Sequence, residues 1–135
     1  MTTTIRKADT HLFVRRALQA DAVASGATGV LLVVGAEQLT DWLGLPVSLM
    51  RYAGLSLLPF AAIVLIVGLR QMPPRAAVAA IVAYNAMWTI DSFVLLASGW
   101  VGPTLLGSSF VVMQAVTVGA LAMLQGIGMK RADRG

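Results

Sequence analysis

Apolar residues fall into four long runs that short polar breaks separate. The runs cover residues 17–36, 47–69, 76–99 and 104–129. Each is long enough to cross the hydrocarbon core of a bilayer as an α-helix, which takes about 20 residues. The pattern predicts an all-α integral membrane protein with a single membrane domain over residues 1–135.

The breaks between the runs are short and rich in proline and glycine. They read GLP at 44–46, QMPP at 71–74 and VGP at 101–103. Proline cannot continue a helix and glycine ends one at little cost, so these stretches separate the spans. Connections this short place consecutive helices antiparallel to one another. We expect an up-down-up-down four-helix bundle.

Positive charge is confined to alternate connections. Lys and Arg residues precede the first run, flank the second break and follow the last run, whereas the first break holds only Glu37 and Asp41. Cytoplasmic loops of membrane proteins carry the excess of Lys and Arg. We therefore predict a multi-pass membrane protein with both termini cytoplasmic. The basic residues that set this orientation are Arg6, Lys7, Arg15, Arg16, Arg70, Arg75, Lys130, Arg131 and Arg134.

A cleaved signal peptide is the alternative for the first run. The small-residue stretch AVASGA at 22–27 resembles a cleavage site, but it precedes the most apolar part of the run. A signal peptide has the opposite order. We expect the first span to be retained.

Composition excludes several kinds of chemistry. The chain is 58% hydrophobic and 12% charged, has no cysteine, and has His11 as its one histidine. Thiol relays, thiolate metal sites and a haem held by two histidines are not available within one chain. The net charge of +4 comes from the span ends, so it indicates no nucleic-acid partner. No metal, cofactor or catalytic residue is predicted.

The third run combines a polar, aromatic face with a lipid-compatible one. At about 100° per residue, one arc of roughly 140° holds Tyr84, Asn85, Trp88, Asp91 and Ser92. Polar residues within a membrane face the bundle interior, so this arc should point inward. Asp91 then serves either as a structural contact between helices or as a ligand or proton site. Tyr84 and Trp88 either wall a lipophilic pocket or pack as core.

Two polar clusters are predicted, separated by an apolar middle. In the outer one, Arg51 lies about 6 Å inside its span and Asp91 about 13 Å inside its own, so that a long arginine side chain reaches the carboxylate. Glu37 and Asp41 are alternative partners for Arg51. The predicted outer cluster comprises Arg51, Tyr84, Asn85, Trp88, Asp91 and Gln114, and the inner one Asp21, Ser25 and Arg70.

Four stretches carry a family resemblance: RALQADAVASGATG, RYAGLSLLPFA, AYNAMWTIDSFVLLASGW and LQGIGMKR. In these the chain resembles a group of short proteobacterial inner-membrane proteins with four helices and no assigned activity. Its layout is similar to that of DoxX-like four-helix proteins. Such a likeness of architecture implies no function.

Three functions compete. The small loops favour an accessory or structural membrane component whose partners are the bilayer and either further copies of itself or another membrane protein. The polar residues around Asp91 and Arg51 instead suit a small transporter or lipophilic-ligand-binding protein. The third hypothesis, an enzyme acting on a lipid-soluble substrate, is the least favoured because no catalytic motif supports it.

Overall fold

The chain folds into an all-α bundle. The computed structural model describes the backbone of residues 2–134 and the side chains of residues 11–132. Four helices are long and apolar enough to span a membrane, over His11–Val34, Val47–Leu69, Arg75–Ser98 and Leu105–Ala132. The predicted fold class is therefore confirmed. The helices are α1 (Thr2–Val34), α2 (Ala36–Leu43), α3 (Val47–Leu69), α4 (Arg75–Ser98) and α5 (Leu105–Arg134).

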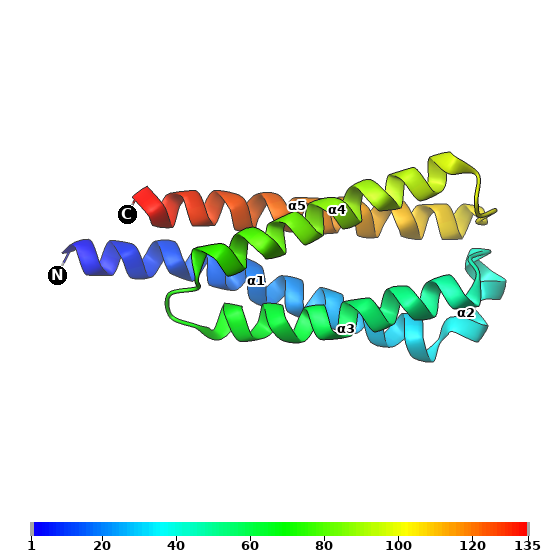
Figure 1. Ribbon diagram of the computed structural model, residues 1–135, viewed down its shortest axis with the longest axis horizontal. Helices are drawn as coiled ribbons and strands as arrows, with labels where there is room; N and C mark the ends of the chain where they lie inside the picture. The colour runs from blue at the N-terminus through cyan, green and yellow to red at the C-terminus, as the bar shows by residue number, and fades with distance from the viewer. Residues whose placement is uncertain (1, 135) are drawn as a thin grey trace.

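The two ends of the bundle differ in what they carry (Figure 1). The start of α1, the end of α5 and the connection between α3 and α4 gather at one end, here called the terminal end. The short helix α2 and the connection between α4 and α5 lie at the other, here called the distal end. The four long helices alternate in direction between these ends.

The first span begins earlier than predicted, because Arg15 and Arg16 do not interrupt α1. The guanidinium of Arg15 donates from Nε to the carbonyl oxygen of Gly68 and from Nη2 to that of Leu69, at 3.4 Å each. These are the last carbonyls of α3, which lack partners within their own helix. The arginine thus lies level with the end of α3 and stabilises it, while α1 continues beyond.

The connection after α1 contains a helix that the sequence reading missed. α2 presents Ala36 and Leu43 to the interior, and it ends at Gly44, whose φ of 70° places it in the left-handed region that favours glycine. The Gly44 N–H donates to the carbonyl oxygen of Thr40 at 2.9 Å. Charge at Glu37 and Asp41 suggested a loop, but both side chains lie on the exposed face of an amphipathic turn.

The long helices associate as two pairs, α1 with α3 and α4 with α5, and α1 packs on α5 to join them. Gly29 and Gly54 let the first pair approach closely: a Cβ added at Gly54 would lie 2.7 Å from the carbonyl oxygen of Gly29. Although α3 and α4 are consecutive, they touch only over a short stretch and diverge toward the distal end (Figure 1).

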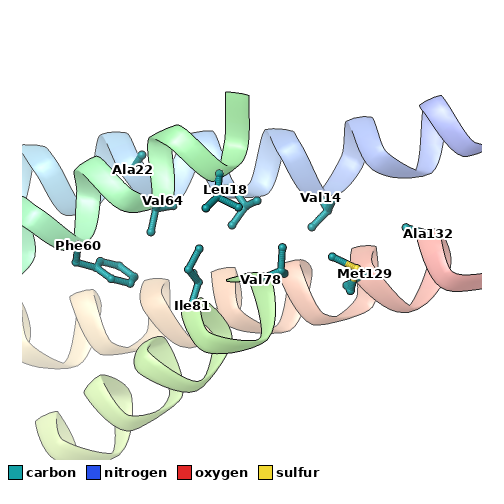
Figure 2. Close-up of a cluster of buried hydrophobic side chains, with 10 residues drawn as sticks. Val14, Leu18, Ala22, Phe60, Val64, Val78, Ile81, Met129 and Ala132 are labelled. Carbon is teal, nitrogen blue, oxygen red and sulfur yellow. The ribbon is translucent and has the colours of Figure 1, made fainter. Parts of the chain in front are cut away.

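Two apolar clusters fill the ends of the bundle. The cluster at the terminal end packs side chains such as Leu18, Phe60 and Ile81 from all four long helices (Figure 2). The distal cluster packs Leu43 of α2 against residues such as Met50 and Val111. Because α2 contacts α1, α3 and α5, it lies across the distal end.

A pair of hydrogen bonds ties the distal connections together. The backbone N–H of Thr104 donates to the carbonyl oxygen of Leu43 at 2.9 Å, and its Oγ1 donates to that of Trp42 at 2.7 Å. Gly107 packs directly on the Leu43 carbonyl, with no room for a Cβ. The start of α5 is therefore fixed to the end of α2.

Candidate functional site

A fully buried polar cluster centres on Asp21. Its Oδ1 accepts a hydrogen bond from Ser25 Oγ at 2.9 Å, and its Oδ2 accepts from Asn85 Nδ2 at 2.7 Å and from Gln125 Nε2 at 2.8 Å. Asn85 Nδ2 also lies 3.2 Å from Gln125 Oε1. We call these four residues the polar clasp, since they join α1, α4 and α5.

The clasp is buried, and its polar side chains are completely hydrogen-bonded. The exposed fractions of Asp21, Asn85 and Gln125 are 0%, 1% and 0%. Among the described side chains, no buried polar atom lacks a partner. A polar group in the membrane interior is costly unless it is hydrogen-bonded, and three donors from three helices meet that need at Asp21. The clasp therefore specifies how α4 sits against α1.

Of the predicted inner cluster, the structure brings Asp21 and Ser25 together and leaves Arg70 apart from them. The Arg70 side chain is exposed at the end of α3, and the partners of Asp21 are amides instead of an arginine. Asn85, predicted for the outer cluster, belongs here. The clasp itself lies between the two apolar clusters of the bundle.

Aromatic rings lead from the clasp toward the distal end. The Phe60 and Tyr84 rings stack with centroids 4.0 Å apart, and the Tyr84 and Trp88 rings stack at 6.2 Å. The Tyr84 hydroxyl lies 2.8 Å from Ser56 Oγ. These contacts link α3 to α4 where the two helices meet, and they fix the orientation of the Trp88 indole.

A second polar network surrounds Trp88. Its Nε1 donates to Gln114 Oε1 at 2.7 Å, and Gln114 Nε2 donates to Ser92 Oγ at 3.0 Å and to the Val111 carbonyl oxygen at 2.9 Å. Ser92 Oγ in turn donates to the Trp88 carbonyl oxygen at 2.8 Å. The predicted proximity of Trp88 and Gln114 is confirmed, and the network holds both side chains in one orientation.

A cavity of about 390 Å³ lies beside this network, in the distal half of the bundle where α3 and α4 diverge. We call it the distal crevice. All four long helices contribute to its wall, which is largely apolar and carries Asp91 as its one charged side chain. Its lining comprises Thr28, Leu32, Leu45, Leu49, Met50, Tyr52, Ala53, Trp88, Asp91, Ser92, Leu95, Phe110, Val111 and Gln114.

Asp91 lies on the rim of the crevice, on the exposed side of α4. It precedes the end of α4 at Ser98 by seven residues, or about 10 Å along the helix axis. Within residues 11–132, its carboxylate makes no hydrogen bond or ion pair. A carboxylate at this depth without a partner is a candidate functional group.

The predicted ion pair between Arg51 and Asp91 is wrong. Arg51 Nη2 instead lies 3.2 Å from Glu37 Oε1, the alternative partner that the sequence allowed. Position 37 falls in α2, which brings its carboxylate over the start of α3. Arg51 does not line the crevice; its neighbours Met50 and Tyr52 do.

A smaller cavity, of about 220 Å³, adjoins the other side of Trp88. Asp21 and Ser25 of the clasp line one part of it, and Thr117 and Leu121 of α5 line another. The two cavities share Thr28, Trp88, Phe110 and Gln114 as walls. Trp88 therefore borders both cavities, whereas the apolar cluster of Figure 2 fills the terminal half of the bundle.

Among the described residues, no group of three or more His, Cys, Asp or Glu side chains is placed to hold a metal ion. The crevice wall carries aromatic side chains and one carboxylate, that of Asp91, whereas the polar groups of the clasp are hydrogen-bonded to one another.

The fold and these cavities define a multi-pass α-helical membrane protein with an internal polar clasp and a lateral crevice. No protein-family model matches the chain, and neither a curated protein nor a solved structure matches it.

Proposed function

We propose that the protein binds a lipophilic small molecule in the distal crevice. The observation that carries this proposal is the cavity itself: about 390 Å³, largely apolar and bordered by a few fixed polar groups. Small-molecule sites in proteins are typically clefts of about 300–1,000 Å³ with this kind of lining. The crevice is at the small end of that range.

The polar part of the wall supports the proposal because it is already held in place. Trp88, Ser92 and Gln114 hydrogen-bond to one another, so they need not reorganise when a ligand enters. A preformed wall lowers the entropic cost of binding. The Tyr84 stack fixes the indole plane further.

The proposed setting is the bacterial inner membrane, with both termini in the cytoplasm. Arg70 and Arg75 at the terminal end support it, as does the lack of Lys and Arg in the connection between α4 and α5. In this orientation the crevice lies in the outer half of the bilayer, and its ligand comes from that leaflet.

A second candidate function is an accessory component that assembles with itself or with another membrane protein. The separation of α3 and α4 favours it, because a helix of a partner would fill the same space and meet Asp91. Both candidates place an occupant in the crevice. They differ in whether that occupant is a small molecule or a protein.

Tryptophan fluorescence tests the first proposal directly. Replacing Trp42 and Trp100, which are 65% and 89% exposed, with phenylalanine leaves Trp88 as the sole indole. A neutral monoacylglycerol with a brominated chain, added to this variant in nanodiscs, should quench Trp88 with a saturable dependence on its concentration. Quenching that stays linear, as for collisions in bulk lipid, would exclude this neutral lipid as an occupant, and the proposal fails if the tetraphenyl ions described below do not bind either.

A matched pair of alanine substitutions on α3 supplies the control. Ala53 lines the crevice, whereas Ala62 lies on the exposed face of the same helix. Ala53→Phe should abolish saturable quenching and Ala62→Phe should leave it intact. Native mass spectrometry of the mildly extracted protein separates the two candidates. A bound small-molecule mass supports the first, and a defined oligomer or protein partner without one supports the second.

A further inference from the structure

We infer that the ligand of the distal crevice is a lipophilic cation and that Asp91 is its counter-ion. This inference rests on the proposed binding function and adds the chemical class of the ligand. It starts from the charge of the cavity wall, where Asp91 is the one ionisable acid among apolar and neutral polar side chains.

The other polar groups of the wall donate no hydrogen bond to the Asp91 carboxylate. Trp88 donates its indole N–H to Gln114, and Gln114 donates to Ser92 and to the Val111 carbonyl. These donors are therefore engaged with each other. Within residues 11–132, no side-chain donor reaches the Asp91 carboxylate.

Arg51, which the sequence predicted as the partner of Asp91, forms an ion pair with another residue. Arg51 pairs with Glu37 above the start of α3, so its charge is already compensated. An unpaired charge at membrane depth is costly, and a ligand of opposite charge removes much of that cost. A neutral ligand would leave the carboxylate unpaired in a drier cavity, and an anion would repel it.

Aromatic side chains in the same wall add a second preference for positive charge. Tyr52, Trp88 and Phe110 all line the crevice, and they come from three different helices. The face of an aromatic ring attracts a cation within about 6 Å of its centre, and indole does so most strongly. The apolar remainder of the wall suits the hydrocarbon part of the same molecule.

Two tetraphenyl ions of matched shape and opposite charge test the inference. Equilibrium dialysis would measure tetraphenylphosphonium and tetraphenylborate against the purified protein in nanodiscs, with protein-free nanodiscs subtracted. The wild type should bind the phosphonium ion saturably and the borate ion at least about tenfold more weakly. A tenfold difference corresponds to about 1.4 kcal/mol, which is modest for a desolvated charge pair.

Asp91→Asn should weaken phosphonium binding about tenfold or more, whereas Asp91→Glu should retain most of it. Asp41→Asn is the matched control, because it removes an equal charge at the same end of the molecule from an exposed position outside the crevice. That variant should bind as the wild type does. Since Asp91 is exposed and makes no hydrogen bond or ion pair within residues 11–132, neither of its variants should melt at a lower temperature than the wild type.

Two results would overturn the inference: phosphonium binding that Asp91→Asn leaves unchanged, or equal binding of the two tetraphenyl ions. Either result, combined with saturable quenching of Trp88 by the neutral brominated lipid, would leave the proposed function standing without its cation preference. If that quenching and the binding of both ions are all absent, the proposed function fails as well.

Discussion

Asn85 donates a hydrogen bond to Asp21 at 2.7 Å from a helix that lies diagonally across the bundle. The backbones of α1 and α4 do not approach one another, so two side chains bridge the interior between them. The carboxylate at the centre also accepts from Gln125, which brings α5 into the same contact. The bridge therefore joins α4 to α1 through side chains, in addition to the packing of α4 on α5.

Asp21→Asn should destabilise the bundle by about 1–3 kcal/mol, because an amide NH₂ replaces an oxygen that accepts from Asn85 and Gln125. The measurement is the free energy of unfolding in mixed micelles titrated with SDS. Asp91→Asn is the isosteric control and should not lower that free energy, because it removes an unpaired charge from membrane depth. Equal losses of unfolding free energy in the two variants would mean that the buried hydrogen bonds of Asp21 add no stability.

Two glycines of α5 should respond to alanine with opposite signs. Gly107 packs on the Leu43 carbonyl with no room for a Cβ, whereas nothing lies within 4 Å of a Cβ at Gly126. Gly107→Ala should lower the free energy of unfolding by more than about 1 kcal/mol, since backbone must move. Gly126→Ala should raise it by about 0.5–1 kcal/mol through helix propensity. The same SDS titration reports both, and a loss at Gly126 would show an unrecognised contact there.

The ion pair of Arg51 with Glu37 should contribute little to stability. Its side chains are 47% and 75% exposed, and exposed pairs typically contribute about 0–1 kcal/mol. A double-mutant cycle with Arg51→Ala and Glu37→Ala should give a coupling energy in that range, smaller still at high salt. The corresponding cycle for Arg51 and Asp91 should give no coupling. A clear coupling energy between Arg51 and Asp91 would show that the two side chains do interact, contrary to the structure.

Single cysteines in this cysteine-free chain test the proposed orientation. Gly102→Cys places a thiol in the connection between α4 and α5, and Gln71→Cys places one between α3 and α4. In intact cells stripped of their outer membrane, a membrane-impermeant maleimide should label position 102 directly and position 71 only after permeabilisation. The reverse pattern would invert the topology, and the crevice would then face the inner leaflet.

The spans could be predicted because their signal is local. Each run of apolar residues is long enough by itself, and the breaks at Pro46, Pro74 and Pro103 separate the helices without reference to tertiary contacts. The proximity of Trp88 and Gln114 could also be predicted, since both project inward at comparable distances from the connection between α4 and α5. Such inferences need only residue spacing along one or two helices.

The clasp could not be predicted, because it depends on how the helices tilt and slide past one another. A helical wheel placed Asn85 on the same face as Asp91, but the inclination of α4 carries it to Asp21 instead (Figure 1). Gln125 gave the available signal: it lies three turns from Gln114 on the same face of α5, and a buried amide needs a partner. The helix α2 was not predicted, because two acidic residues between apolar runs suggested a loop. As a result, Asp91 and not Glu37 was predicted as the partner of Arg51.

The hydrogen bonds of Thr104 to Leu43 and Trp42 fix the end of α2 to the start of α5 at the distal end of the bundle, and the apolar cluster of Figure 2 fills the terminal end. With the two ends of the bundle packed in this way, the proposed ligand would enter from the side, where α3 and α4 diverge. The concentration that governs occupancy is then the mole fraction of the ligand in the surrounding leaflet. An affinity expressed as total ligand per litre would shift with the amount of lipid in the assay. Values from different preparations become comparable only when the ligand concentration is given as a mole fraction of the membrane.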